Sequence, residues 1–180
     1  RVQAGVIELL PMTPVFVEAV LDGRRDDAAA ELAIEIPDEF PSEGDKAFLG
    51  MRLRQMRQDS GFRIWCPHAV VLNGRMIGHA GYHGPPGVNA TQNPAAVEFG
   101  YMIFPAYRGH GYATRAAAML MEMAEERAGI RHFVLSVGPH NEPSLAIVRK
   151  LGFVRTGEQM DEVDGLEYVF ELSRSGSAAP

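Results

Sequence analysis

The residues best suited to chemistry form a short glycine-containing segment, Arg108 to Ala113, which reads RGHGYA. An alanine-rich run with helically spaced apolar residues follows at once, so the segment lies at the start of a predicted helix, residues 111–128. A helix N-terminus offers about four free backbone N–H groups and a partial positive charge. Glycines there let a bulky anion approach the backbone. The segment therefore predicts a phosphate site that suits a pyrophosphate.

Three phosphate-loop patterns can be compared with this segment. The Walker pattern GxxxxGK[ST] is absent. A dinucleotide GxGxxG would need glycine at position 114, where Thr114 stands, and an acidic residue about 20 positions later on a second strand. The third pattern, R/Q-x-x-G-x-G/A, is satisfied by Arg108, Gly111 and Ala113. A plain glycine-rich turn is the alternative interpretation.

Glu98 is the candidate general base. It lies in an otherwise apolar predicted strand, VEFGYMIF, residues 97–104. A carboxylate beside buried surface tends to have a raised pKa, which suits a base. The alternative is a structural carboxylate that pairs with a neighbouring strand.

The remaining elements must position these residues. Asn73-Gly74 between two apolar runs predicts a hairpin, and Thr13, Ser42 and Asn141 are predicted to begin helices. Gly61 is expected to end the third helix. The predicted helices cover 14–23, 25–33, 42–61, 111–128 and 142–152, and the predicted strands cover 6–9, 70–72, 76–82, 97–104, 132–137 and two segments around Asp164-Gly165.

This order predicts an α+β fold with a mixed sheet. The strand at 97–104, the helix at 111–128 and the strand at 132–137 form one parallel crossover. We expect one domain, residues 1–173, and a disordered tail, residues 174–180.

Composition narrows the function classes. The 180 residues are 46% hydrophobic and 22% charged, with a net charge of −6 and no basic block, so nucleic acid is not the expected partner. The single cysteine, Cys66, excludes an internal disulfide and an all-cysteine metal site. No run reaches the ~18 apolar residues of a membrane span, and we expect a cytoplasmic protein with no membrane partner. His79 and His83 would be ~13 Å apart along a strand, too far to share a metal, so we predict no metal.

Two segments resemble a known family. VEFGYMIFPAYRGHGYATRAA and VGPHNEPSLAIVRKLGFVRTGE are similar to the GNAT superfamily of acyl-CoA-dependent N-acetyltransferases, and within it to the branch of RimJ and RimL. The resemblance covers roughly residues 5 to 173. It implies a three-layer α/β fold: a mixed, mostly antiparallel central sheet with a parallel β-α-β acyl-CoA-binding core and helices on both faces.

The resemblance also implies roles for residues. The backbone amides from Gly109 to Ala113 would bind the CoA pyrophosphate, Thr114 could add a hydroxyl, and Asn141 would hydrogen-bond the pantetheine arm. A backbone N–H near Ile103 would hold the oxyanion. The full predicted cofactor set is Met102, Ile103, Phe104, Arg108, Gly109, His110, Gly111, Tyr112, Ala113, Thr114, Asn141 and Ser144. Arg149 and Lys150 could meet the adenosine phosphate; a solvated helix face is the alternative.

The chain departs from a common family pattern at the leaving-group acid. Many members carry a tyrosine seven positions after the asparagine, and here that position is Val148. Ser144 could reach the sulfur and act by hydrogen bonding or through water; its alternative role is a helix-capping hydroxyl. No acid is required in principle, because a thiolate is already a fair leaving group.

The reaction that follows is transfer of an acetyl group from acetyl-CoA to a primary amine, by direct transfer in a ternary complex. The amine would be a protein N-terminus or a small molecule, entering near Glu39, Glu43, Asp45 and Trp65 and under the loop at 84–96, which is long enough to be a lid. His83 could border this pocket or be a surface histidine. A non-catalytic acyl-CoA sensor and a binding protein for another nucleotide are the rival functions, and homodimerisation stays open.

Overall fold

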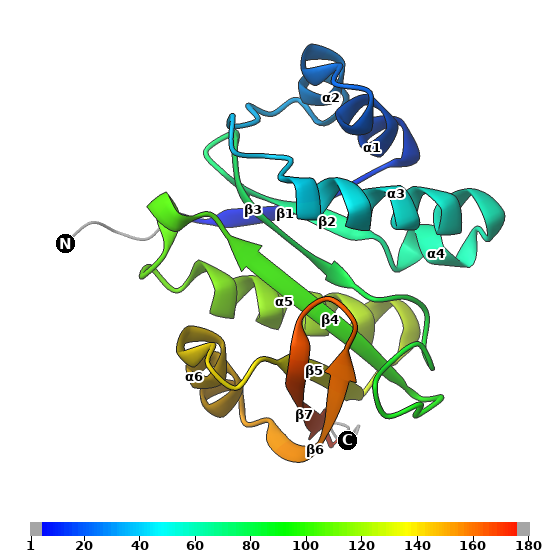
Figure 1. The fold of residues 1–180 in the computed structure, drawn as a ribbon, viewed down its shortest axis with the longest axis vertical. Helices are drawn as coiled ribbons and strands as arrows, with labels where there is room; N and C mark the ends of the chain where they lie inside the picture. The colour runs from blue at the N-terminus through cyan, green and yellow to red at the C-terminus, as the bar shows by residue number, and fades with distance from the viewer. Residues whose placement is uncertain (1–4, 176–180) are drawn as a thin grey trace, which may run out of the picture. The chain divides into compact units, whose positions relative to one another are not determined.

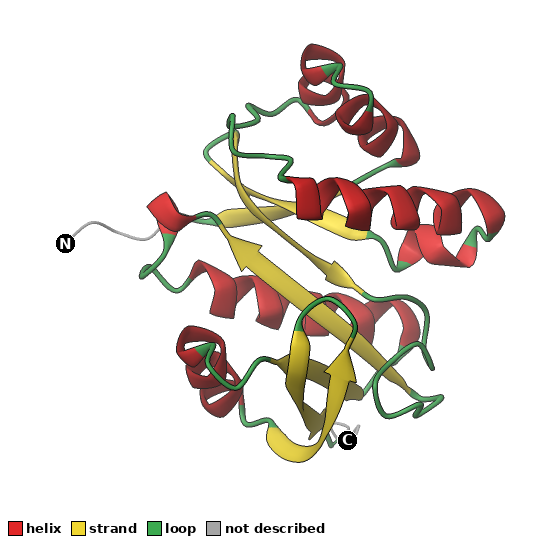
Figure 2. Ribbon diagram, in the orientation of Figure 1, coloured by secondary structure: helices red, strands yellow, loops and turns green. Residues whose placement is uncertain are grey.

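The computed structural model describes residues 5–175, so most of the predicted tail lies outside the described residues. The described chain is a mixed α/β fold with seven strands and six α-helices (Figures 1 and 2). The strands are β1 Ile7–Pro11, β2 Pro67–Leu72, β3 Arg75–Tyr82, β4 Ala96–Ile103, β5 His132–Val137, β6 Val154–Asp161 and β7 Gly165–Ser173. The helices are α1 Pro14–Leu21, α2 Arg25–Leu32, α3 Glu43–Gln58, α4 Gly61–Ile64, α5 Tyr112–Ala128 and α6 Glu142–Leu151, with a 3-10 turn at Pro105–Tyr107.

The strands follow the order β1-β2-β3-β4-β5-β7-β6 in one hydrogen-bonded sheet. The β1–β2, β2–β3, β5–β7 and β6–β7 pairs are antiparallel, and β4–β5 is parallel, with Val97 opposite Phe133. The predicted mixed sheet and its parallel crossover are confirmed.

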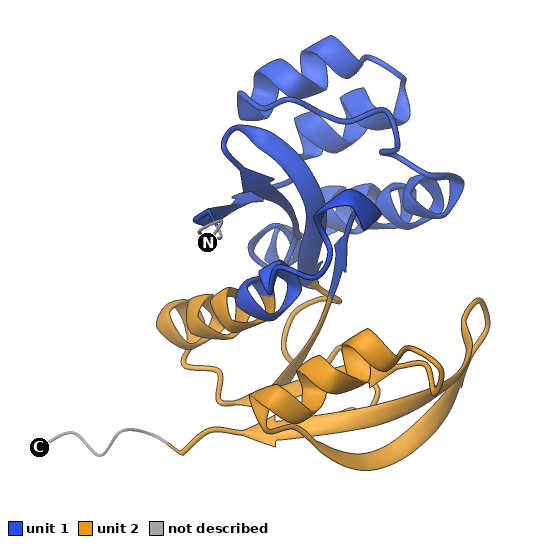
Figure 3. Cartoon of the chain, turned by 90° about the vertical axis from the view of Figure 1, so that its left-hand side faces the viewer, with its two compact units in different colours: residues 1–81, 101–116 blue, residues 82–100, 117–180 orange. Residues whose placement is uncertain are grey.

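The chain divides into two compact units (Figure 3). Unit 1 comprises residues 1–81 and 101–116, and unit 2 comprises residues 82–100 and 117–180. Strand β4 begins in unit 2 and ends in unit 1.

Local sequence signals explain the elements of unit 1. The Thr13 side chain accepts a hydrogen bond from Phe16 N, and Ser42 and Asp45 form a reciprocal capping box at the start of α3. Asn73 and Gly74 turn the β2–β3 hairpin with φ of 50° and 77°. The core of this unit gathers buried side chains from α1, α3 and the β2–β3 hairpin, including Phe16, Leu49 and Met76.

One predicted boundary in unit 1 is wrong. Helix α3 ends at Gln58 rather than at Gly61, because Asp59 adopts an extended conformation with φ of −139°. The Asp59 carboxylate then accepts a hydrogen bond from Gly61 N at 2.8 Å, and Gly61 opens the short helix α4. The side chain of Asp59 therefore competes with helix continuation, as Asp side chains do in turns.

Unit 2 contains the β5–β7–β6 strands, the start of β4, most of α5, and α6. The Phe99 ring of β4 packs edge-to-face against Phe133 and Phe153, with ring centroids 6.3 Å and 6.2 Å apart. Gly152 ends α6 in the left-handed region with φ of 84°, as its position after the helix predicts. Among the described residues, no helix is both long and apolar enough to cross a membrane.

Candidate functional site

The loop before α5 has the backbone that a phosphate site needs. Gly109 and Gly111 adopt φ of 83° and 81°, a conformation that other residues reach only with strain. No described atom lies within 4 Å of where a Cβ would stand at either glycine. The glycines are therefore required by conformation, and the space beside them is open.

The first turn of α5 leaves backbone donors at this loop. The bond from Arg115 N to the Gly111 carbonyl, 3.0 Å, closes the first helical turn. The amides of Tyr112, Ala113 and Thr114 lie before that bond and have no partner from the helix itself. Tyr112 is buried and its ring lies 5.8 Å from that of His110, so the helix start is anchored while Gly109 to Gly111 stay exposed.

Arg108 ties this loop back to the end of β4. Its Nε donates to the Ile103 carbonyl at 2.8 Å, and its Nη2 approaches the Met102 sulfur at 3.5 Å. Phe104 N donates to Ile77 O at 2.8 Å. Two of the backbone groups predicted for the pantetheine arm thus have partners within the protein. The roles of Met102, Ile103 and Phe104 in cofactor binding stay predictions.

Gly78 is a residue that the sequence interpretation missed. A Cβ at this position of β3 would collide with the Met102 carbonyl and meet Ile103 Cα at 3.0 Å. A glycine inside a strand is the signal of such close backbone approach. Gly78 therefore allows β3 to approach the end of β4 closely, at the residues Met102 and Ile103 that are predicted to meet the cofactor.

In unit 2, Glu98 is the centre of a hydrogen-bonded cluster. Its carboxylate is 2% exposed. Oε1 accepts from Ala90 N at 2.8 Å, Oε2 accepts from Ser136 Oγ at 3.0 Å, and Oε2 also lies 3.0 Å from His83 Nδ1. Gln159 Nε2 extends the network by donating to Ser136 Oγ at 3.2 Å. His83 and Ser136 are partners that the sequence did not reveal.

The expectation of a raised pKa for Glu98 is wrong. Burial alone raises the pKa of this carboxyl group, but the hydrogen bond and charge of His83, the Ala90 N–H and the Ser136 hydroxyl outweigh it, and the pKa lies below its ordinary value of 4.5. Glu98 is therefore ionised at neutral pH and accepts from three neighbours. A carboxylate stabilised in this way is a weak base.

The loop at 84–95 covers Glu98 and is held by its own polar groups. The Asn89 side-chain Oδ1 accepts from Thr91 N and Asn93 N, and its side-chain Nδ2 donates to the main-chain carbonyls of Asn93 and Ala96. Gly87 N donates to Ala96 O at 3.0 Å. The loop is thus hydrogen-bonded to Ala96, the first residue of β4, and its role as a lid stays a prediction.

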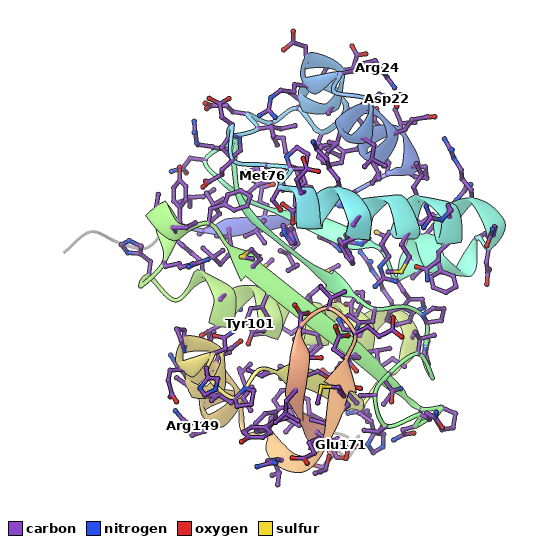
Figure 4. All side chains as sticks on the ribbon, viewed as in Figure 1. Asp22, Arg24, Met76, Tyr101, Arg149 and Glu171 are labelled. Carbon is purple, nitrogen blue, oxygen red and sulfur yellow. The ribbon has the colours of Figure 1, made fainter. Side chains whose placement is uncertain are left out.

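Asn141 and Ser144 come together at the start of α6. Asn141 Oδ1 accepts from Ser144 N at 3.2 Å, so the cap is the Asn141 side chain and Ser144 contributes its backbone. Val148 is fully buried. Arg149, labelled in Figure 4, is two-thirds exposed and lies 3.9 Å from the Glu142 carboxylate, which supports the solvated-face interpretation.

The residues predicted near the acceptor differ in exposure and in their partners. In unit 1, Asp45 Oδ1 lies 3.1 Å from His79 Nε2, and the His79 ring packs among Phe40, Phe48 and Phe104. Burial raises the pKa of Asp45, but the His79 hydrogen bond and the Ser42 cap outweigh it and the pKa is lowered. Glu39 and Glu43 are exposed and Trp65 is buried. No three His, Cys, Asp or Glu side chains of the described residues could hold one metal ion.

Comparison with known proteins identifies the family of this chain. Residues 7–154 match the acetyltransferase (GNAT) domain. Spermidine N(1)-acetyltransferase of Escherichia coli K12 is 42% identical over 65 residues, which are 36% of this chain and 35% of that protein. The matched segment thus spans about a third of the length of this curated relative.

Solved structures share the fold. The yncA structure from Salmonella typhimurium, with its cofactor acetyl-CoA, is 19% identical with a TM-score of 0.60, covering 99% of this chain and 98% of that one. RimJ of Mycobacterium smegmatis, in complex with CoA-disulfide, is 17% identical with a TM-score of 0.62, covering 94% and 82%. The family match spans most of the chain, and the open, glycine-bearing helix start lies within it. The chain belongs to the GNAT acetyltransferase family.

Proposed function

We propose that this protein is an N-acetyltransferase that transfers the acetyl group of acetyl-CoA to a primary amine. The observation that carries the proposal is the start of α5, where Gly109 and Gly111 have positive φ and open space beside them. The free amides of this helix terminus fit a pyrophosphate. Family membership supports acyl-CoA as the source of that pyrophosphate.

Different residues would bind different parts of acetyl-CoA. The amides from Gly109 to Ala113 bind the pyrophosphate, and Thr114 adds its hydroxyl. Backbone groups of Met102 to Phe104 and the Asn141 side chain would hold the pantetheine arm, and the Ser144 hydroxyl would hydrogen-bond the sulfur. Acetyl-CoA supplies an activated thioester. Transfer is direct, because Cys66 is only 3% exposed and is therefore poorly placed to carry an acyl group.

The acceptor is a primary amine, either a small molecule or a protein N-terminus. Spermidine is the first small amine to test, because the spermidine N(1)-acetyltransferase relative shares 42% identity over its matched segment. A cytoplasmic location belongs to the same proposal, since acetyl-CoA is consumed there. Size-exclusion chromatography with light scattering would decide whether the chain is a homodimer.

The test is acetyl transfer itself. The full chain is incubated with acetyl-CoA and a panel of spermidine, small monoamines and peptides with free N-termini, and both released thiol and product mass are measured. Amine-dependent thiol release with an acetylated product supports the proposal. Gly111→Glu is the control, because its charge would repel the pyrophosphate and its side chain would strain the loop.

Two outcomes would contradict the proposal. Acetyl-CoA binding without an acetylated product across the panel would favour a non-catalytic sensor. Val148, which stands where many family members carry a tyrosine acid, would fit that outcome. Binding of another nucleotide in preference to acetyl-CoA would remove the cofactor assignment.

A further inference from the structure

His83 and Glu98 form a pair in which one partner is buried and the other reaches solvent. The Glu98 side chain is 3% exposed and the His83 side chain is 47% exposed. His83 follows β3 directly, and its backbone N donates to Glu98 O at 2.8 Å, so the two residues are also fixed by the main chain. The pair is thus fixed by the main chain, with a buried carboxylate and a half-exposed imidazole.

The hydrogen bonds settle which ring nitrogen of His83 carries the proton. An ionised carboxylate can only accept, so the Nδ1 that lies 3.0 Å from Glu98 Oε2 must donate. In the neutral ring Nε2 is then the unprotonated nitrogen and can accept a proton. Glu98 is in turn oriented by Ala90 N and Ser136 Oγ.

The ring of His83 lies over β4 at Gly100. A Cβ built at Gly100 would be 3.6 Å from His83 Nε2. Glu98, Gly100 and Met102 alternate along the same strand, so their side chains belong to one face. Within unit 2, Nε2 therefore lies on the face of β4 that Glu98 and Gly100 share.

The groups around His83 favour a cationic acceptor. Glu98 on β4 contacts the ring, and Asp161 at the end of β6 acts on it electrostatically. Glu98 also acts on Glu167 of β7. The segment 84–95 that follows His83 contains no titratable side chain. Two carboxylates, those of Glu98 and Asp161, therefore act on this imidazole.

We infer that His83 is the proton acceptor for the amine substrate and that Glu98 positions it. This inference rests on the proposed acetyltransferase function. Nε2 takes one proton from the acceptor ammonium, and the amine lone pair forms a bond to the thioester carbonyl carbon. The C–S bond breaks with its electron pair going to sulfur, the second amine proton reaches the CoA thiolate, and the imidazolium returns its proton to solvent.

The test compares kcat and acetyl-CoA affinity in four chains: wild type, His83→Gln, Glu98→Gln and His132→Gln. His83→Gln should lower kcat by ~10²-fold or more at neutral pH, with acetyl-CoA affinity unchanged. The loss of kcat on the acid side of the wild-type pH profile should disappear in His83→Gln. The kcat of Glu98→Gln should lie between those of the wild type and His83→Gln, because glutamine keeps the shape of the side chain but removes the charge that orients the His83 ring.

His132→Gln is the matched control, because His132 is an exposed histidine of the same unit that contacts Ser173 Oγ at 2.8 Å. It should keep the wild-type rate. Added imidazole should restore part of the rate of His83→Ala, which a purely structural histidine would not show.

The outcomes separate the two claims. A wild-type chain that binds acetyl-CoA but acetylates no amine would overturn the proposed function and this assignment with it. An active wild type with an unaffected His83→Gln, or a His83→Ala variant that imidazole does not rescue, would overturn the assignment alone.

Discussion

At the scale of single residues, Glu98 shows how neighbours decide the chemistry of a buried charge. Desolvation penalises the carboxylate, yet His83, Ala90 N and Ser136 stabilise it more, and its pKa is lowered. A lowered carboxyl pKa adds stability to the fold above the pKa of the unfolded chain. That stability is lost as pH falls through the folded pKa. Glu98 thus makes the free energy of unfolding depend on pH in the acidic range.

We predict that Glu98→Gln lowers the free energy of unfolding at pH 7 by about 1–3 kcal/mol, because the buried hydrogen-bond network loses its charge and one of its two acceptor oxygens. The deficit should shrink as pH falls from the ordinary Glu value of 4.5 through the lowered pKa of folded Glu98, where the wild type also loses the charge. Urea denaturation at a series of pH values from about 3 to about 8 would measure the free energy of unfolding of both chains.

Glu158→Gln is the control for that series. Glu158 pairs with Arg155 at 2.9 Å on the surface, where ion pairs contribute about 0–1 kcal/mol. A constant deficit for Glu98→Gln at every pH would show that the carboxylate is not stabilised by folding.

At the scale of elements, α6 depends on a side-chain cap that is also a predicted cofactor ligand. Asn141 Oδ1 accepts from Ser144 N, and Pro143 occupies the first turn. An aspartate can keep the capping oxygen, whereas its carboxylate lacks the amide N–H donors. Capping and cofactor binding by Asn141 can therefore be separated.

We predict that Asn141→Ala costs about 1 kcal/mol of stability, while Asn141→Asp retains it. Both variants should bind acetyl-CoA more weakly than wild type, because both lack the amide donors. Thermal melts and titration calorimetry would measure the two effects. Wild-type acetyl-CoA affinity in Asn141→Asp would exclude an N–H contact from this residue to the pantetheine arm.

At the scale of the whole molecule, the predicted cofactor residues belong to both compact units. The loop from Arg108 to Thr114 is in unit 1, and Asn141 and Ser144 are in unit 2. A ligand that binds only the folded chain stabilises it by mass action. The choice of cofactor can therefore be read from the stability of the intact chain.

We predict that acetyl-CoA at about 100 times its Kd adds ~2.7 kcal/mol of stability, a rise in Tm of roughly 5–10 °C for a chain of this size. ATP and NAD at the same concentration should not reproduce this shift, and Gly111→Glu should abolish it. Differential scanning fluorimetry is the measurement. Stabilisation by ATP but not by acetyl-CoA would contradict the cofactor assignment.

The sequence by itself determined the features that depend on short stretches of chain. The RGHGYA loop, the caps at Thr13, Ser42 and Asn141, and the Asn73-Gly74 turn all follow from local backbone and hydrogen-bonding preferences. The predicted end of α3 at Gly61 was wrong, because the Asp59 carboxylate accepts a hydrogen bond from Gly61 N and α3 ends early.

Only the tertiary structure decided the environment of Glu98. Its partners come from the end of β3, the loop before β4 and a neighbouring strand, and Ser136 is 38 residues away in sequence. Such partners depend on strand register and loop path, which local propensity does not encode. The sequence marked Glu98 as unusual, and the fold made it an ionised carboxylate that orients His83.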